Sequence, residues 1–229
     1  LALAQVNKEC RDVVYKIPAL EFMRMCTYYD DSTGVSCIYR AAAMQRVYKA
    51  VVIGRLDVLK WLWEREPSCH RYHYIGDAGY HGQKEVLDWF YTLPREDFPI
   101  KDLHRPEQFV KDLATFSEAL KGAARGGHLE LVKHLREKGC EWDEWTCAAA
   151  AQEGHVHVLE YLRTNGCPWN SEACTDAASR DHLDTLKWLR EHGCPWDEKV
   201  TAVAAENGHF ETLKWLHEHG CPWDAESFA

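Results

Sequence analysis

A helical pattern of apolar and polar residues recurs along the second half of the chain. In the segment HLDTLKWLREHGC, leucines stand three positions apart at Leu183, Leu186 and Leu189. Charged residues fill the positions between and after them: Asp184, Lys187, Arg190 and Glu191. This spacing predicts an amphipathic helix with one apolar side. Gly193 favours a left-handed cap at its C-terminal end, and Pro195 prevents the helix from continuing.

Another helix is predicted after the short loop that follows this cap. Asp197, and Asn170 one repeat earlier, offer an N-cap, and a nearby glutamate suits the start of a helix. The helix then runs through small residues such as Ala204 and Ala205, which allow two helices to lie close together. Each unit is therefore expected to contain a helix, a tight turn, a second helix and a short loop.

This two-helix unit repeats every 27 residues. The spacing is kept by the cysteines Cys140, Cys167, Cys194 and Cys221, the tryptophans Trp142, Trp169, Trp196 and Trp223, and the histidines His128, His155, His182 and His209. One helical pair cannot bury its apolar side alone, so we expect the units to stack around a continuous linear core. The expected core columns are Leu129, Val156, Leu183 and Phe210; Val132, Leu159, Leu186 and Leu213; and Leu135, Leu162, Leu189 and Leu216.

Four strings of the chain resemble the ankyrin repeat: AARGGHLELVKHLREKGC, AAQEGHVHVLEYLRTNGC, AASRDHLDTLKWLREHGC and AAENGHFETLKWLHEHGC. They follow its pattern of two alanines, two variable residues, Gly-His, a leucine-rich helix and a closing glycine. The usual repeat has about 33 residues, so about six are missing, most simply from the β-hairpin finger. The Thr-Pro-Leu-His start is replaced by WTCA, ACTD or VTAV. The resemblance implies an all-α, ankyrin-like solenoid of stacked helix-turn-helix repeats with short loops instead of full fingers.

The repeat array is expected over residues 41–229. Degenerate repeats over 41–95 keep turn glycines at Gly54 and Gly82, and regular repeats occupy 117–229. Between them, residues 96–116 form an insertion, with an extra short helix expected at Pro106–Phe116. We interpret the insertion as filler, with a place on a binding face as the alternative. Residues 1–40 carry no repeat, and their segment LALAQVNKECRDVVYK resembles the last helix of an F-box-like domain.

Composition and charge narrow the possible partners. The formal net charge of −9 argues against a surface that neutralises nucleic-acid phosphates. The sequence has neither an apolar run of roughly 20 residues nor a signal-peptide pattern, so we expect no membrane partner and an intracellular, cytoplasmic or nuclear protein. Because several of the 10 cysteines fall at one fixed place in the repeat, we interpret them as reduced thiols.

The repeated residues invite chemical hypotheses that the spacing disfavours. Neighbouring helices pack about 8 to 10 Å apart, which is too far for turn cysteines of adjacent units to share a zinc ion or form a disulfide. We expect these cysteines to fill the turns as small apolar groups, and the histidines to be structural. The tryptophans, together with Trp188 and Trp215, are expected to seal the joints between units.

Other chemistry finds little support in the sequence. We expect the chain to bind no metal ion, because a paired ligand motif is missing. The alternative is a zinc site at Cys69, His70, His73 and His81. The sequence contains no catalytic motif, so we expect no enzyme activity, cofactor or small-molecule substrate.

The ankyrin resemblance implies that the chain binds a partner protein on its concave side. The residues that correspond to the family's variable positions are Arg125, Gly126, Gln152, Glu153, Ser179, Arg180, Glu206 and Asn207, together with Tyr80 and His81. The loop tips add Glu144, Glu172 and Glu198. Because several of these residues are acidic, we expect the partner to have a basic surface. The alternative is a substrate-recognition adaptor of a cullin-type ubiquitin ligase, docked through the F-box-like N-terminus; an array without a fixed partner is the third possibility.

Overall fold

The computed structural model describes residues 46–65, 73–93 and 114–223. Its contacts divide the chain into one unit of residues 1–78 and 83–110 and another of residues 79–82 and 111–229. Every regular element in the described parts of the chain is a helix, so the expected all-α class is confirmed there. The F-box-like segment, Cys69, His70 and most of the expected insertion lie outside the described residues.

The first compact unit contains a helix over residues 46–53, α4 (Leu56–Arg65), most of α5 (His73–Tyr80) and α6 (Lys84–Thr92). Aromatic side chains contribute much of its core. The ring of Trp63 meets Trp89 and Phe90 edge-on, with centroids 5.6 and 5.4 Å apart. The side-chain amide of Gln83, the N-cap of α6, donates a hydrogen bond to the carbonyl of Val52 at 2.7 Å. This bond ties the start of α6 to the helix over 46–53.

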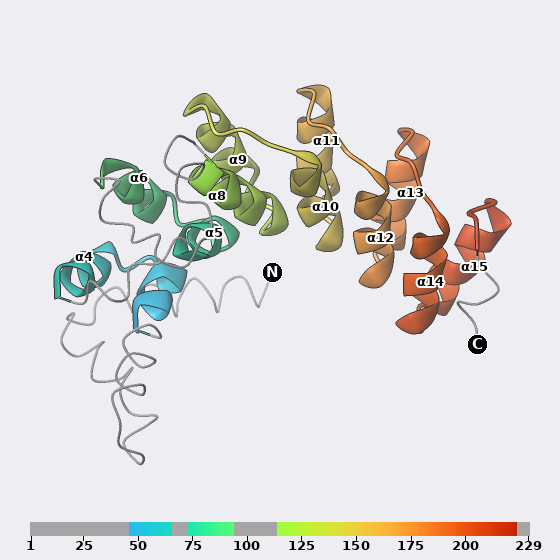
Figure 1. The fold of residues 1–229 in the computed structure, drawn as a ribbon, viewed down its shortest axis with the longest axis horizontal. Helices are drawn as coiled ribbons and strands as arrows, with labels where there is room; N and C mark the ends of the chain where they lie inside the picture. The colour runs from blue at the N-terminus through green and yellow to red at the C-terminus, as the bar shows by residue number, and fades with distance from the viewer. Residues whose placement is uncertain (1–45, 66–72, 94–113, 224–229) are drawn as a thin grey trace, which may run out of the picture. The chain divides into compact units, whose positions relative to one another are not determined.

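The second compact unit contains four successive helical pairs (Figure 1). The pairs are α8 (Ala114–Arg125) with α9 (Leu129–Glu137), α10 (Glu144–Gln152) with α11 (Val156–Thr164), α12 (Ser171–Ser179) with α13 (Leu183–Glu191), and α14 (Glu198–Glu206) with α15 (Phe210–Glu218). Helix α8 begins at Ala114, so residues 114–116 of the expected insertion form the start of this first helix.

Small residues set the packing of the first helices, α8, α10, α12 and α14. Helix α10 packs against α8 and α12, and α12 packs against α14, while each second helix packs against its own first helix. Ala150 and Ala151 of α10, and Ala177 and Ala178 of α12, are fully buried in these contacts. Because alanine has a single side-chain carbon, it allows the close approach that the sequence predicted.

Two of the three expected core columns on the second helices are largely confirmed. Leu135, Leu162, Leu189 and Leu216 are all buried, as are Val132, Leu159 and Leu186 of the second column. The third column is wrong at Phe210, which is 71% exposed, and its other members are only half-buried. These residues begin their helices, at the edge of the apolar side. The core instead includes the column Leu131, Val158, Thr185 and Thr212.

Local chain chemistry fixes the ends of the helices as the sequence predicted. Gly193 follows α13 with a φ of 80°, a left-handed conformation that costs glycine little. Asp143, Asn170 and Asp197 are N-caps whose side chains accept hydrogen bonds from backbone N–H groups of the first turn. Asp197 also accepts a hydrogen bond from the Ser171 hydroxyl at 2.8 Å, so this cap joins α14 to the preceding unit.

Candidate functional site

The residues expected to bind a partner occupy equivalent places in the structure. Arg125, Gln152, Ser179 and Glu206 are the last residues of the first helices, and Glu153, Arg180 and Asn207 are C-caps. Tyr80 ends α5 and His81 follows it. We call the solvent-facing side of the first helices the first-helix face; it carries Glu118, Arg125, Trp145, Gln152, Glu172, Asp176, Ser179, Lys199 and Glu206.

Several of these residues contact one another across the boundaries between units. The guanidinium of Arg125 donates a hydrogen bond to the Gln152 side chain, and Arg180 lies 3.9 Å from a carboxylate oxygen of Glu153. These two contacts set equivalent side chains of neighbouring units beside one another, in rows that cross the first-helix face. The rings of Tyr80 and His81, which are adjacent in the sequence, instead lie edge to face within one unit, with centroids 5.0 Å apart.

Other residues expected to bind a partner make side-chain hydrogen bonds within their own helix. The Ser179 hydroxyl donates to the carbonyl of Asp176 at 2.8 Å, and the Asn207 amide donates to the carbonyl of Val203 at 2.8 Å. The glutamates expected at loop tips lie in the first turns of α10, α12 and α14. A nine-residue helix is about 13 Å long, so these glutamates and the C-cap residues lie near opposite ends of the face.

Trp145 is a residue of this face that the sequence interpretation missed. Its side chain is 50% exposed, although tryptophan has a large apolar area. Its equivalents in the other units are Glu118, Glu172 and Lys199, and Lys199 contacts Glu172 at 3.6 Å. The sequence did contain a signal for this residue, because Trp145 is the one aromatic residue in a column whose other members are charged. Because equivalent residues of neighbouring units lie side by side, Trp145 lies between Glu118 and Glu172.

Asp176, in the middle of α12, was also missed. Burial, and then the neighbouring charge of Glu172, raise the pKa of the Asp176 carboxyl, although Arg125 and Arg180 oppose this shift. The ionised carboxylate is therefore less favourable here than in water. The first-helix face thus holds a carboxylate that a cation from a partner would stabilise.

Three of the four repeated tryptophans lie at the joints between units, as expected. Trp142, Trp169 and Trp196 each meet an aromatic ring of the next unit edge-on, with centroids 6.4, 6.2 and 6.0 Å apart. Each also lies against an arginine of its own unit at about 4 Å, as cation–π pairs do. These rings are half-buried rather than core residues, and Trp223 is 58% exposed.

The turn cysteines are buried, reduced thiols, as the spacing predicted. Cys167 and Cys194 donate Sγ–H hydrogen bonds of 3.4 Å to the N-cap carbonyls of Asp143 and Asn170, at the start of the same helical pair. The structure adds a pairing that the sequence did not predict: Cys167 contacts Cys147, and Cys194 contacts Cys174. The contact with the second thiol, and then burial, raise the pKa of Cys167. The thiol is therefore protonated at neutral pH and is no nucleophile.

The repeated histidines join neighbouring units. Each is the N-cap residue of a second helix. The ring of His128 donates to the carbonyl of Tyr80 at 2.9 Å, and that of His209 donates to the carbonyl of Ser179 at 3.0 Å. His155 makes the equivalent hydrogen bond to the backbone of Arg125. The structural role expected for this column is confirmed at these three positions.

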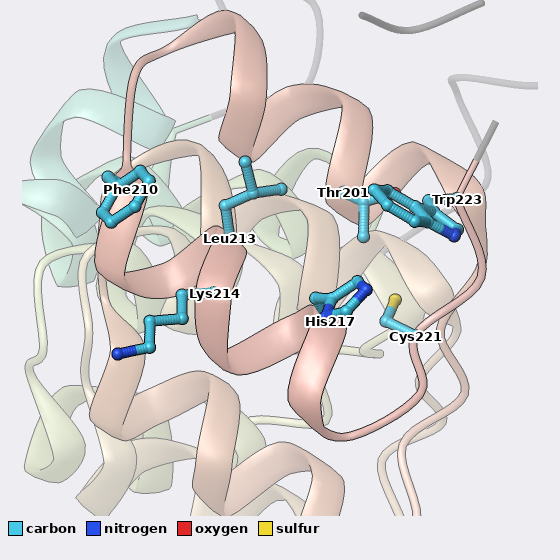
Figure 2. A pocket seen from close by; sticks show the side chains of 7 residues that line it. All are labelled: Thr201, Phe210, Leu213, Lys214, His217, Cys221 and Trp223. Atoms are coloured by element: carbon cyan, nitrogen blue, oxygen red, sulfur yellow. The ribbon is translucent and has the colours of Figure 1, made fainter. Parts of the chain in front are cut away.

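A cavity of about 240 Å³ opens on the last helical pair (Figure 2). It is lined by Thr201 of α14, by four residues of α15 and by two residues of the turn that follows: Phe210, Leu213, Lys214, His217, Cys221 and Trp223. The lining is mostly apolar and contains one permanently charged group, Lys214. This surface is separate from the expected partner-binding residues.

Neither a metal site nor a membrane span is found where the structure describes the chain. Residues 46–65, 73–93 and 114–223 hold no group of three or more histidine, cysteine or acidic residues placed to bind a metal ion. None of the helices in these ranges is long and apolar enough to cross a bilayer.

The chain matches no family model, and no curated protein matches it.

Proposed function

We propose that the chain is a non-catalytic protein-binding module, an ankyrin-like solenoid of short repeats that holds a partner on its first-helix face. The observation that carries this proposal is the 50% exposed Trp145 among charged side chains. Packing of the helices does not require an aromatic residue there, because the equivalent positions of the other units are charged. Exposed tryptophans surrounded by polar groups are the usual anchors of protein interfaces.

The order of the helical pairs supports an ankyrin-like array. Each pair has a short first helix lined with alanines and a second helix with a leucine-rich apolar side, as the ankyrin resemblance implies. In such arrays neighbouring units present their equivalent residues side by side, which creates an extended binding surface. The cross-unit contacts of Arg125 with Gln152 and of Arg180 with Glu153 fit this arrangement.

The charges of the face favour a partner segment that contains lysine or arginine. Glu118 and Glu172 flank Trp145 in its row, and ionised Asp176 lies one helical turn beyond Glu172. A lysine side chain lying across the indole would place its ammonium group near these carboxylates. It would also offset the unfavourable ionisation of Asp176.

Site-specific photo-crosslinking in the cells of origin tests the location of the surface. A photoreactive amino acid at Gln152 of the first-helix face should capture a defined protein. The same amino acid at Glu160, which is exposed on the second helix α11, is the matched control. Equal capture of the same protein at both positions would contradict a role of the first-helix face.

Affinity measurements with the captured protein test the residues. Trp145→Ala should weaken binding by roughly tenfold or more, as truncation of an interface anchor does. Phe210→Ala removes an even more exposed aromatic residue outside the face and should leave the affinity unchanged. Charge reversal at Glu153 and Glu206, and a salt increase from about 0.05 to about 0.3 M, should each weaken binding. An affinity that changes with neither the charge reversals nor the salt concentration would contradict a partner with a basic surface.

A further inference from the structure

Two helical pairs of the second unit each hold two cysteine thiols in direct contact. In α10–α11, Cys147 of α10 contacts Cys167 in the turn after α11. In α12–α13, Cys174 of α12 contacts Cys194 in the turn after α13. All four are free thiols with fully buried side chains. We call each contacting couple a thiol pair; the same arrangement occurs twice, 27 residues apart.

Hydrogen bonds show that the repeat itself brings these two positions together. Cys167 donates to the N-cap carbonyl of α10, and Cys147 lies one helical turn further along that helix. In the last pair, Thr201 is the equivalent of Cys147. Its hydroxyl donates to the carbonyl of Pro222, the residue after Cys221, at 2.9 Å. Thr201 and Cys221 also line the same cavity (Figure 2).

Packing does not require a cysteine on the first helix. The turn cysteine is present in all four regular units, but its neighbour is Leu120 in the first unit and Thr201 in the last. Both of these side chains are buried as well. The second thiol is therefore a property of the two middle helical pairs. Two adjacent thiols can form a disulfide, whereas a thiol beside leucine or threonine cannot.

We propose that each thiol pair is a site of oxidative modification, at which a peroxide converts the two thiols into a disulfide within one helical pair. The ionised sulfur of one cysteine attacks a peroxide oxygen, and the O–O bond breaks. With hydrogen peroxide this leaves a sulfenic acid and a hydroxide, which takes up the proton that the thiol lost. The sulfur of the second cysteine then attacks the sulfenic sulfur. The S–O bond breaks, and the hydroxyl group leaves as water with the second thiol's proton. The two thiols lose two electrons and two protons, and one hydrogen peroxide becomes two water molecules.

Opening of the helical pair controls this reaction. In the closed pair, contact with the second thiol and then burial raise the pKa of Cys167 and of Cys174, so these thiols stay protonated. Local opening admits water and the peroxide, and a thiol that meets water can ionise. The disulfide then closes a loop of about 20 residues, which restricts the unfolded chain and disfavours further opening. Oxidation therefore holds closed the two helical pairs that contain the thiol pairs.

Peptide mapping of the oxidised full chain tests the site. The reduced protein is treated with hydrogen peroxide in native buffer, the remaining thiols are alkylated, and the digest is analysed by mass spectrometry without reduction. We expect one disulfide between Cys147 and Cys167 and another between Cys174 and Cys194. The turn cysteines of the other two regular units should form no disulfide within their own helical pairs. Thiol pairs that stay reduced, or that link to cysteines outside their own helical pair, would overturn the proposal.

Two variants exchange the residues of matched positions. Cys147→Thr copies the residue found at Thr201, and it should remove the disulfide of α10–α11 while Cys174 and Cys194 still form theirs. Thr201→Cys creates a third thiol pair with Cys221 and should add a third disulfide. Circular dichroism before oxidation verifies that both variants keep their helices. Failure of either expectation in a folded chain would overturn the proposed pairing.

Hydrogen exchange tests the consequence of oxidation. Backbone amides of α10 to α13 should exchange roughly tenfold more slowly or less in the oxidised chain than in the reduced chain, because each disulfide opposes opening of its helical pair. Amides of α8 and α9, whose unit has Leu120 in place of the first thiol, should change less. Equal exchange of α10 to α13 in the two forms would overturn the role of the disulfides in holding these pairs closed.

Discussion

At the scale of single residues, the histidine column illustrates how one side chain can serve two units. His155 caps α11 and makes a hydrogen bond to the backbone of Arg125 in the preceding unit. Burial lowers the pKa of His155, and His157 and His128 lower it further, while the Arg125 hydrogen bond and Glu153 oppose the shift. The neutral ring is therefore the form that stabilises the folded protein.

We expect the stability of the protein to depend on pH through His155. Below the ordinary histidine pKa of about 6.5, the unfolded chain binds a proton that the folded chain resists, so the free energy of unfolding falls as pH decreases. The contribution of His155 to the change in the free energy of unfolding stays well below about 1.4 kcal/mol per pH unit, because the half-buried ring is screened by solvent. Urea unfolding at pH 7.5 and pH 5.5 measures the effect.

His155→Gln is the matched variant for this measurement, because its amide can still donate to the carbonyl but does not titrate. The wild-type protein should lose more stability than the variant between the two pH values. Parallel losses in both proteins would show that His155 does not titrate in this range.

Residue roles that depend on the local chain were predictable, and those that depend on contacts between segments far apart in the sequence were not. The burial of the turn cysteines follows from a fixed column next to a capped helix. The contact of Cys147 with Cys167 joins two different columns, so no period in the sequence shows it. The exposure of Trp145 also depends on how closely α10 lies to α8 and α12, which the alternation of residues does not fix.

At the scale of elements, the turn between the two helices of a unit depends on a left-handed residue. Glycine holds this place in the other regular units, but the third has Asp181, with a φ of 60°. Its carboxylate also accepts a hydrogen bond from the Thr212 hydroxyl of the next unit at 2.7 Å. The aspartate thus fixes the turn and connects two units.

Asp181→Ala should lower the free energy of unfolding by about 1 to 2 kcal/mol, because alanine is strained in this conformation and removes the acceptor of Thr212. Asp181→Asn should be nearly neutral, since asparagine tolerates a left-handed backbone and keeps a side-chain oxygen. Urea unfolding of the two variants and the wild type gives the comparison. An alanine variant as stable as the asparagine variant would mean that neither the backbone nor the hydrogen bond matters.

The sequence predicted the ends of the helices more accurately than it predicted which residues of each helix are buried. Caps at Asp197 and Gly193 depend on residues a few positions apart, so their chemistry is readable in one short stretch. The expected burial of Phe210 required a neighbouring unit on the far side of α15, and the described residues contain none. The leucine spacing fixes an apolar side for each second helix, but the packing partner decides how much of that side is buried.

At the scale of the whole second unit, stability comes from contacts between consecutive helical pairs. The pair α10–α11 has packed pairs on both sides, whereas α14–α15 is packed by a described pair on one side only. In arrays of this kind each unit gains stability from its immediate neighbours. The last pair should therefore open independently of the middle pairs and more often.

Native-state hydrogen exchange of the protein should show this gradient. Backbone amides of α14 and α15 should exchange roughly tenfold faster or more than those of α10 and α11, because the described residues pack against α14–α15 on one side only. Equal protection of all four pairs would instead mean that the unit unfolds as one cooperative body, in which the ends are as strongly held as the middle.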